Sequence, residues 1–232
     1  MKYPRHLAII ADGNRTRAQE QWMPTMDGHF AWAQKTLELL EHVFTTTPVE
    51  IVTWWFLSTE NLKKRTPAEV EFLVHLTISM GNDIDQLLGK YHINFRRAGN
   101  PEWLPAHFVT FLDDKAKKLT FPDSNKTAVF CFNYGWRDEI IRGIKSLSAT
   151  DIANITEESF AKHLDFGAMV PLDMVIRTKW DTAHRTSGFM SWRIGYAELY
   201  FAKEYYPAFT MEKLDESLKR YDSVAEDRNF GK

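Results

Sequence analysis

Short apolar runs alternate along this chain with longer stretches in which apolar residues recur at helical spacing. The short runs are rich in β-branched and aromatic side chains, which is typical of strands buried on both faces. They predict strands at 6–11, 50–57, 91–97, 126–133, 172–178 and 198–201. Helical spacing predicts helices at 28–44, 67–88, 105–119, 136–147 and 210–221, and a short helix after Ile155 that Thr156 caps. This alternation predicts an α/β fold, with a mostly parallel six-stranded sheet flanked by helices.

Composition narrows the class of protein. A length of 232 residues fits a single α/β domain over 1–232, and an apolar content of 44% is enough for a substantial core. The formal charge of -2 gives no overall basic field, so we expect no nucleic-acid partner. No apolar stretch approaches the ~20 residues of a transmembrane segment, and the first residues do not resemble a secretory signal. The one cysteine, Cys131, lies in an apolar run, so we expect a buried thiol in a reducing, cytoplasmic setting.

Polar residues follow several of the expected strands directly. Asp12, Gly13 and Asn14 come after the first strand, and Ser58 comes after the second. The carboxyl ends of parallel strands share one edge of a sheet, where open α/β sheets bind ligands. We therefore expect one site at this edge. Its candidate residues are Asp12, Asn14, His29, Ser58, Glu60, Asn61, Arg177, Arg185, Ser187 and Glu198.

This set of side chains suits two phosphorylated groups and a divalent cation. Arginine binds phosphate through two parallel hydrogen bonds, and a helix N-terminus adds backbone N–H donors. Mg²⁺ takes one or two carboxylates together with water and substrate phosphates. The chain has no Ser-His-Asp order and no Gly-x-x-x-x-Gly-Lys loop, which argues against a phosphatase or kinase on a doubly wound sheet. The basic run at 63–65 is either a solvated loop or a further anion-binding segment.

Seven segments, in order along nearly the whole chain, resemble those of one known family. They are HLAIIADGN (6–14), the Gly-His pair (28–29), FLSTEN (56–61), NYG with a following arginine (133–137), DMVIRT (173–178), RTSGFMSW (185–192) and YAELYF (196–201). Together they resemble the cis-prenyltransferases, the family of undecaprenyl diphosphate synthase. A lone Asp-Gly-Asn triplet is a weak signal, whereas seven segments in the right order are specific.

The resemblance implies a Mg²⁺-dependent enzyme that joins two isoprenoid diphosphates and works as a homodimer. It implies that Asp12 holds the metal ion against the diphosphate of an allylic donor, with Glu198 as a second metal ligand. Gly13, Asn14 and the residues at 15–17 would bind that same diphosphate.

The resemblance also assigns the second substrate. It implies that Arg177, Arg185 and Ser187 bind the acceptor's diphosphate, with Ser58 as a further substrate contact. His29 and Asn61 join Asp12 and Asn14 among the catalytic side chains. Asn61 matches a family position near the proton that the acceptor loses, and one of the two diphosphates is the alternative base.

The chain departs from the family pattern at several substrate-facing positions. Thr16 stands at the position of a family arginine that binds the allylic diphosphate, and Arg17 stands at the position of a family tryptophan. Thr25 replaces a second such arginine, and Leu62 replaces a tryptophan. Lys-Trp-Asp at 179–181 replaces Gly-Gly-Glu in a longer loop, and the tail motif Arg-x-Gly reads Asn-Phe-Gly at 229–231. Each lost charge-assisted contact costs roughly 1.5–3 kcal/mol, and Arg15 or Arg17 are candidates to compensate.

Departures at these positions, beside intact scaffold segments, predict altered substrate pairing. The first hypothesis is irregular head-to-middle coupling, in which a dimethylallyl or geranyl diphosphate donor meets dimethylallyl diphosphate as acceptor and gives a branched, lavandulyl-type product. The alternative is regular cis elongation with isopentenyl diphosphate. A lesser alternative is a non-catalytic partner subunit, although such subunits typically lack the Asp-Gly-Asn signature that this chain keeps.

Several candidate residues also have a purely structural interpretation. Asp12 can cap a helix, His29 can be a buried polar residue, Glu198 can be a sheet-edge carboxylate, and Arg177 can pair with Asp173 or Asp181. The bulky residues at 54–56 and at 72, 73 and 76 are expected in the core, with one face lining a tunnel that suits a short product.

Overall fold

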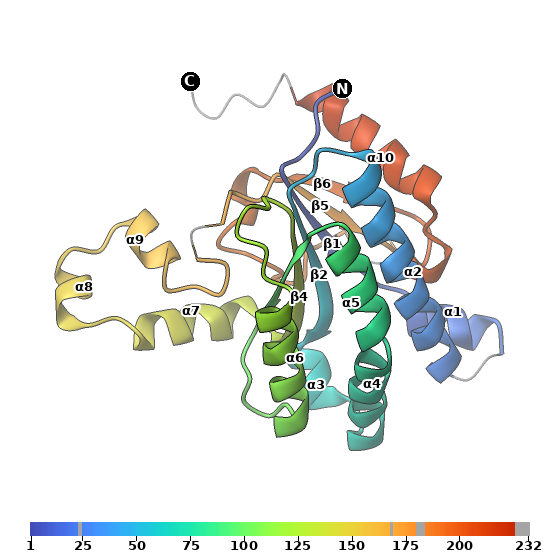
Figure 1. Ribbon diagram of the computed structural model, residues 1–232, viewed down its shortest axis with the longest axis horizontal. Coiled ribbons are helices and arrows are strands. Elements are labelled where there is room, and N and C mark those ends of the chain that lie inside the picture. Colours follow the sequence, from blue (N-terminus) through green and yellow to red (C-terminus); the bar gives the residue numbers. More distant parts are fainter. Residues whose placement is uncertain (23–24, 168, 180–183, 226–232) are drawn as a thin grey trace.

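A six-stranded parallel sheet forms the centre of the molecule (Figure 1). The computed structural model describes residues 1–22, 25–167, 169–179 and 184–225. The strands are β1 (His6–Ile10), β2 (Ile51–Ser58), β3 (Asn94–Ala98), β4 (Thr127–Tyr134), β5 (Met174–Arg177) and β6 (Glu198–Phe201). Their order is β3-β4-β2-β1-β5-β6, and every pairing is parallel. The α/β fold expected from the sequence is therefore confirmed.

Some of the departures noted in the sequence lie outside the described part of the chain. They are the side chain of Thr25, the residues Trp180 and Asp181, and the tail at 229–231.

The central strands are buried on both faces. Successive residues of a strand point to opposite sides, so Leu7 and Ile9 join the core on one face while Ala8 and Ile10 join the core on the other. Burying a side chain such as Leu or Ile contributes roughly 1.5–3 kcal/mol, so both faces stabilise the sheet. Cys131 lies in the second core and is a buried free thiol, as expected.

Helices cover the sheet and extend beyond it. They are α1 (Asn14–Glu20), α2 (Thr25–Thr46), α3 (Thr59–Lys64), α4 (Pro67–Ser79), α5 (Gly81–Lys90), α6 (Ala106–Lys118), α7 (Trp136–Lys145), α8 (Ala149–Ala153), α9 (Glu157–Ala161) and α10 (Met211–Val224). Two short 3₁₀ helices occupy Ile194–Tyr196 and Tyr206–Ala208. In Figure 1, α2, α4, α5 and α6 cover one face, and α7 to α9 form an arm that projects from the sheet. Among the described residues, no helix is both long and apolar enough to span a membrane.

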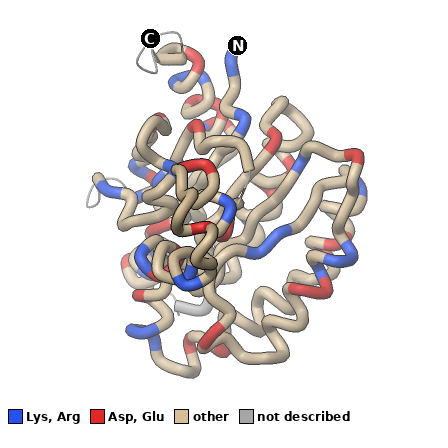
Figure 2. Tube along the Cα trace, turned by 90° about the vertical axis from the view of Figure 1, so that its left-hand side faces the viewer, with Lys and Arg blue, Asp and Glu red and all other residues tan. Residues whose placement is uncertain are grey.

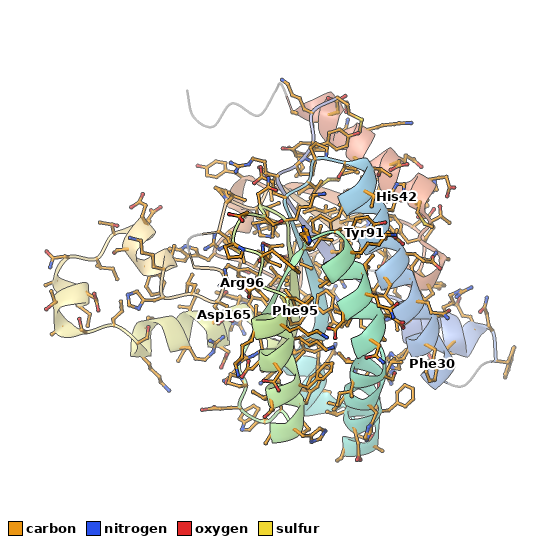
Figure 3. All side chains as sticks on the ribbon, viewed as in Figure 1. Phe30, His42, Tyr91, Phe95, Arg96 and Asp165 are labelled. Atoms are coloured by element: carbon orange, nitrogen blue, oxygen red, sulfur yellow. The ribbon has the colours of Figure 1, made fainter. Side chains whose placement is uncertain are left out.

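Contacts between helices fix α2 against its neighbours on this face. Tyr91, directly after α5, donates from its hydroxyl to a carboxylate oxygen of Glu41 on α2 at 2.8 Å. Towards the other end of α2, Phe30 packs edge-on against Phe72 of α4, with ring centroids 5.5 Å apart. Figure 3 labels Phe30 and Tyr91 at these two places. The face of α2 that carries the Gly28-His29 pair is therefore held in place above the sheet edge.

The single helix expected at 67–88 is wrong. Two helices occupy this range, and Met80 is the cap residue that ends α4 and begins α5. The break depends on tertiary packing, because a Cβ at Gly81 would lie 2.9 Å from the Cε2 atom of Phe111. The first helix does begin as expected, with Pro67 in its first turn and the Thr66 hydroxyl accepting the N–H of Glu69 at 3.2 Å.

Candidate active site

A cavity of about 750 Å³ opens where β1, β2 and β5 end. It brings together residues from distant parts of the sequence, as expected for the carboxyl edge of a parallel sheet. The candidate residues that line it are Asp12, Gly13, Asn14, Arg15, Thr16, His29, Ser58, Glu60, Asn61, Arg177, Arg185 and Ser187. Arg17 and Glu198 belong to the described part of the chain but do not line it.

Asp12 and Arg177 form an ion pair in the cavity wall. The Nη2 group of Arg177 donates to Oδ2 of Asp12 at 2.7 Å. Its Nη1 group donates to the hydroxyl of Ser187 at 2.9 Å and to the carbonyl of Arg185. The Arg177 side chain is 6% exposed and that of Asp12 is 37% exposed, so the carboxylate faces the cavity while the guanidinium is enclosed. The structural alternative of an Arg177–Asp173 pair is wrong, because Asp173 accepts two backbone N–H groups at the start of β1 instead.

The turn after β1 holds the Asp12 carboxylate at the cavity edge. Gly13 has a φ of 101°, in the left-handed region that favours glycine. A Cβ at this position would also lie 2.5 Å from Cδ1 of Tyr205. The Thr178 hydroxyl accepts the N–H of Asp12 at 2.9 Å and donates to its carbonyl at 2.7 Å. Gly13 is the N-cap of α1 and no side chain caps this helix, so the interpretation of Asp12 as a helix cap is wrong.

A second charged group lies beside the cavity around Glu69. Its Oε1 atom is 3.3 Å from Nε of Arg65, 3.7 Å from Nε2 of His29 and 3.8 Å from Nε of Arg15. Within the described residues, Oε1 of Glu69, Nε2 of His29 and Nε and Nη1 of Arg65 are buried atoms without a hydrogen-bond partner. Buried polar atoms usually have partners, so this group has unused capacity to bind a polar ligand.

Burial sets the charge of His29. Enclosure of the ring, followed by the positive charge of Arg65, lowers the pKa of His29 to about 4, and the opposing attraction of Glu69 is a smaller effect. At neutral pH the imidazole is therefore uncharged, with one N–H donor and one acceptor nitrogen. It offers the cavity a polar contact, whereas the positive charge comes from the arginines.

Sequence reasoning does not single out Lys64, Arg65 and Glu69 as site residues. The sequence feature that could have indicated Lys64 and Arg65 is the basic run at 63–65, which is interpreted either as a solvated loop or as an anion-binding segment. Lys64 and Arg65 line the cavity. Lys63 turns away, with its Nζ 5.0 Å from the ring centroid of Trp103. The short helix α3 ends at Lys64 and directs the next residue inward, which supports the anion-binding interpretation.

Ser58 and Asn61 are linked by a helix cap. The Ser58 hydroxyl accepts the N–H of Asn61 at 3.0 Å and so caps α3. Ser58 is buried by this contact, whereas Asn61 is exposed at the cavity. Ser58 therefore has a structural role, and a substrate contact by it stays a prediction.

Thr16 and Lys179, at two of the departures from the family pattern, lie in contact. Nζ of Lys179 donates to Oγ1 of Thr16 at 2.7 Å. Of the two arginines expected to compensate nearby, Arg15 lines the cavity and Arg17 does not.

The expected grouping of Glu198 with Asp12 is wrong within one chain. Glu198 begins β6 and stands in register with Met174, which is itself in register with Leu7 of β1. Glu198 is thus at the amino edge of the sheet, whereas Asp12 follows the carboxyl edge. A role of Glu198 in metal binding stays a prediction.

An aromatic wall lies next to these polar groups. Trp32, Trp55, Phe56 and Leu73 line the cavity. Trp32 meets Phe56 edge-on, with ring centroids 4.6 Å apart, and Trp55 stacks on Phe189 at 4.8 Å. Anionic head groups and hydrocarbon tails need these two kinds of lining side by side.

The donor set fits Mg²⁺ better than a metal held by protein alone. In the described residues there is no group of three or more His, Cys, Asp or Glu side chains placed to hold a metal ion. Asp12 instead offers one partly exposed carboxylate at the cavity. Mg²⁺ typically takes one or two carboxylates and completes its shell with water and substrate phosphates. Elsewhere acidic and basic residues are distributed over the chain without one basic face in view (Figure 2).

Comparison with known proteins gives the family. The family model described as "Putative undecaprenyl diphosphate synthase" matches residues 10–231. An isoprenyl transferase of Treponema denticola is 34% identical over 220 residues, which cover 94% of this chain and 93% of that protein. A tritrans,polycis-undecaprenyl-diphosphate synthase (geranylgeranyl-diphosphate specific) of Thermoplasma volcanium is 33% identical over 240 residues, covering 99% and 89% of the two chains.

A solved structure shows the same fold. It is lavandulyl diphosphate synthase from Lavandula x intermedia in complex with dimethylallyl diphosphate, with a TM-score of 0.87 and 23% identity, covering 94% of this chain and 95% of that one. The chain therefore belongs to the undecaprenyl diphosphate synthase family and is a prenyl diphosphate synthase of the cis-prenyltransferase type.

Proposed function

We propose that this cavity joins dimethylallyl diphosphate, as acceptor, to a dimethylallyl or geranyl diphosphate donor by irregular head-to-middle coupling. The observation that carries prenyl transfer is the meeting, at one sheet edge, of the Asp12–Arg177 pair, further cationic side chains and an aromatic wall. Two diphosphates and their hydrocarbon tails fit such a lining.

The donor diphosphate would bind beside Asp12 and the start of α1. Backbone N–H groups there have no partner within the helix and can donate to phosphate oxygens. Arg15 and Arg65 contact Glu69 only at 3.8 and 3.3 Å. Both cations can therefore turn to a diphosphate, and they would take over part of the work that the family pattern gives to arginines at positions 16 and 25.

Asp12 would hold Mg²⁺ against this diphosphate. The bound ion supplies charge neutralisation on the leaving group. Arg177 orients the carboxylate through its 2.7 Å contact and is itself held by Ser187. The acceptor diphosphate would bind at Arg177, Arg185 and Ser187, which line the same cavity.

The reaction balances with these groups. The bond between C1 and oxygen of the donor breaks, and its diphosphate leaves with the bonding pair. The acceptor's double bond supplies the pair for the new bond to C1, and the resulting cation loses a proton near Asn61, with a diphosphate oxygen as base. Trp55 and Phe56 exclude water and present aromatic surface to the allylic cation.

Irregular coupling is favoured because the positive charges around the expected donor site differ in position from those of the family pattern. Thr16 lines the cavity without a charge of its own, while Lys64 and Arg65 reach it from α3 and the residue after it. One solved structure with this fold is that of a lavandulyl diphosphate synthase. Regular elongation with isopentenyl diphosphate is the second candidate, favoured by the relatives that are named isoprenyl transferase or undecaprenyl-diphosphate synthase.

Substrate pairing can be tested with three reactions in the presence of Mg²⁺. The enzyme is given dimethylallyl diphosphate alone, geranyl with dimethylallyl diphosphate, or geranyl with isopentenyl diphosphate, and products are identified by mass spectrometry after dephosphorylation. We expect branched products from the first two. Product only with isopentenyl diphosphate would overturn irregular pairing and leave prenyl transfer standing. No diphosphate release in any mixture would support a non-catalytic partner subunit.

A homodimer built on the β6 edge completes the proposal. Next to Glu198, the apolar side chains of Tyr196, Leu199 and Trp192 are 74%, 46% and 40% exposed. Exposed apolar residues on an edge strand mark a contact with another chain. Light scattering of the Leu199→Glu variant tests this: we expect monomers, and an unchanged dimer would exclude this edge.

A further inference from the structure

Thr16 and Lys179 are 163 residues apart in sequence, and the hydrogen bond between them is 2.7 Å long. Thr16 lines the cavity between Arg15 on one side and Gln19 one turn further along α1. Lys179 does not itself line the cavity, but the bond brings its ammonium group, from the segment that follows β5, into contact with a residue that does.

The backbone of Lys179 is held in an unfavourable conformation. Its φ of 63° lies in the left-handed region, which glycine adopts freely and other residues adopt at a cost. Its N–H donates to the carbonyl of Glu204 at 2.8 Å. The preceding Thr178 is clamped to the Asp12 turn by its hydroxyl. Strain of this kind is concentrated at functional sites, and here the residue that bears it is the one that carries the charge.

The ammonium of Lys179 contacts a neutral group. Among the described residues, no carboxylate oxygen lies within the 4.0 Å of an ion pair from its Nζ. By contrast, Arg177 is paired with Asp12, and Arg65 lies near Glu69. Lys179 keeps two further N–H donors and a positive charge that these carboxylates do not offset.

We infer that Lys179 binds the diphosphate of the donor, together with the Thr16 hydroxyl, and so supplies from the β5 side the positive charge that position 16 lacks. The inference rests on the proposed function, because it assumes an organic diphosphate in this cavity. An ammonium is a compact point charge, whereas a guanidinium fixes an oxyanion through two parallel bonds. With Lys179 in place of the family's arginine at position 16, the donor site would keep its positive charge but hold the diphosphate in a less strictly fixed geometry.

Binding of an unreactive donor analogue tests this inference. The probe is dimethylallyl S-thiolodiphosphate, titrated with Mg²⁺ into the full-length enzyme by calorimetry. The variant Lys179→Gly removes the ammonium, keeps the N–H that binds Glu204, and suits a φ of 63°. We expect its Kd to rise by roughly 10-fold to 100-fold, as for the loss of a hydrogen bond to a charged group. Its thermal midpoint should not fall.

Matched variants separate charge from structure. Lys179→Arg, and Thr16→Arg in the Lys179→Gly background, should recover the affinity, and high salt should reduce the difference from wild type. Lys145→Met, an exposed lysine at the end of α7, should bind like wild type.

Equal affinity of wild type and Lys179→Gly would overturn the inference and leave the proposed function intact. Recovery by neither arginine variant would overturn the role of the charge. No binding of the probe by wild type would overturn the proposed function itself.

Discussion

Replacing Asp12 separates its part in folding from its part in chemistry. The change leaves Arg177, which is 6% exposed, without the carboxylate that it contacts at 2.7 Å. Removing one partner of a fully buried pair costs roughly 3–5 kcal/mol, and an exposed pair contributes roughly 0–1 kcal/mol. Asp12 is 37% exposed and Arg177 keeps its bond to Ser187, so this pair lies between the two limits. We expect Asp12→Ala to lower the free energy of unfolding by about 2 kcal/mol.

Asp12→Asn should be milder, because the amide oxygen can still accept from Arg177, and we expect a loss of about 1 kcal/mol. Both variants should stay folded, since domains are stable by roughly 5–15 kcal/mol. Neither has the charge to hold Mg²⁺, so diphosphate release should fall by roughly 10²-fold or more in both.

The assay pairs urea unfolding, followed by tryptophan fluorescence, with Mg²⁺-dependent diphosphate release. Asp173→Asn is the matched control, because the Asp173 carboxylate accepts the N–H groups of Arg5 and His6 at 2.8 and 3.1 Å, away from the cavity. It should lower stability and leave turnover unchanged. Asp12→Asn with more than a tenth of wild-type turnover would refute the role of the carboxylate.

Three further changes test other parts of the account. Gly28→Ala puts a Cβ 2.7 Å from the carbonyl oxygen of Asn14, so α1 must shift. We expect urea unfolding to show a free energy of unfolding lower by about 1–3 kcal/mol. An unchanged midpoint of urea unfolding would contradict this close packing. Burial lowers the pKa of His6 to about 4, so the unfolded chain takes up this proton near pH 6.5 and the folded protein only near pH 4. Stability is therefore complete above pH 6.5 and falls as the pH drops towards 4; wild type should lose up to about 3 kcal/mol more than His6→Asn over this range, and equal losses would contradict a buried neutral ring. Trp32→Leu removes the ring that meets Phe56 edge-on in the cavity wall, which leaves more room for the donor's hydrocarbon tail. We therefore expect kcat/KM to shift from dimethylallyl diphosphate towards donors with longer tails. An unchanged donor preference would show that this pair of rings does not limit the length of the donor.

Much of the fold could be predicted because the strands are apolar on both faces. The run expected at 126–133 is β4 at 127–134 with a shift of one residue. The break between α4 and α5 could not be predicted in the same way, because it depends on how closely Gly81 meets Phe111. The helices α1, α3 and α8 have seven, six and five residues, which is too short for a periodic pattern to mark them.

In the candidate site too, some residues could be placed from the sequence and others depend on tertiary structure. Asp12 and Arg177 could be placed together because parallel strands end at one edge. Glu198 was misplaced because the family resemblance groups it with Asp12, although the strand expected at 198–201 begins at this residue and its register puts it at the amino edge of the sheet. Arg65 and Glu69 could not be assigned to the site from the sequence, because α3 and the start of α4 determine where their side chains point. The contact of Lys179 with Thr16 joins two loops that no local pattern connects.

The most direct test of the central claim is the carbon NMR spectrum of the product made from dimethylallyl diphosphate labelled with ¹³C at C2, as sole substrate. Head-to-middle coupling turns the acceptor's C2 into a saturated methine and leaves the donor's C2 in a double bond. We expect one aliphatic and one alkene signal of equal intensity, dependent on Mg²⁺ and lost in Asp12→Asn. Label that stays entirely in double bonds, or product that forms only when isopentenyl diphosphate is added, would contradict the account.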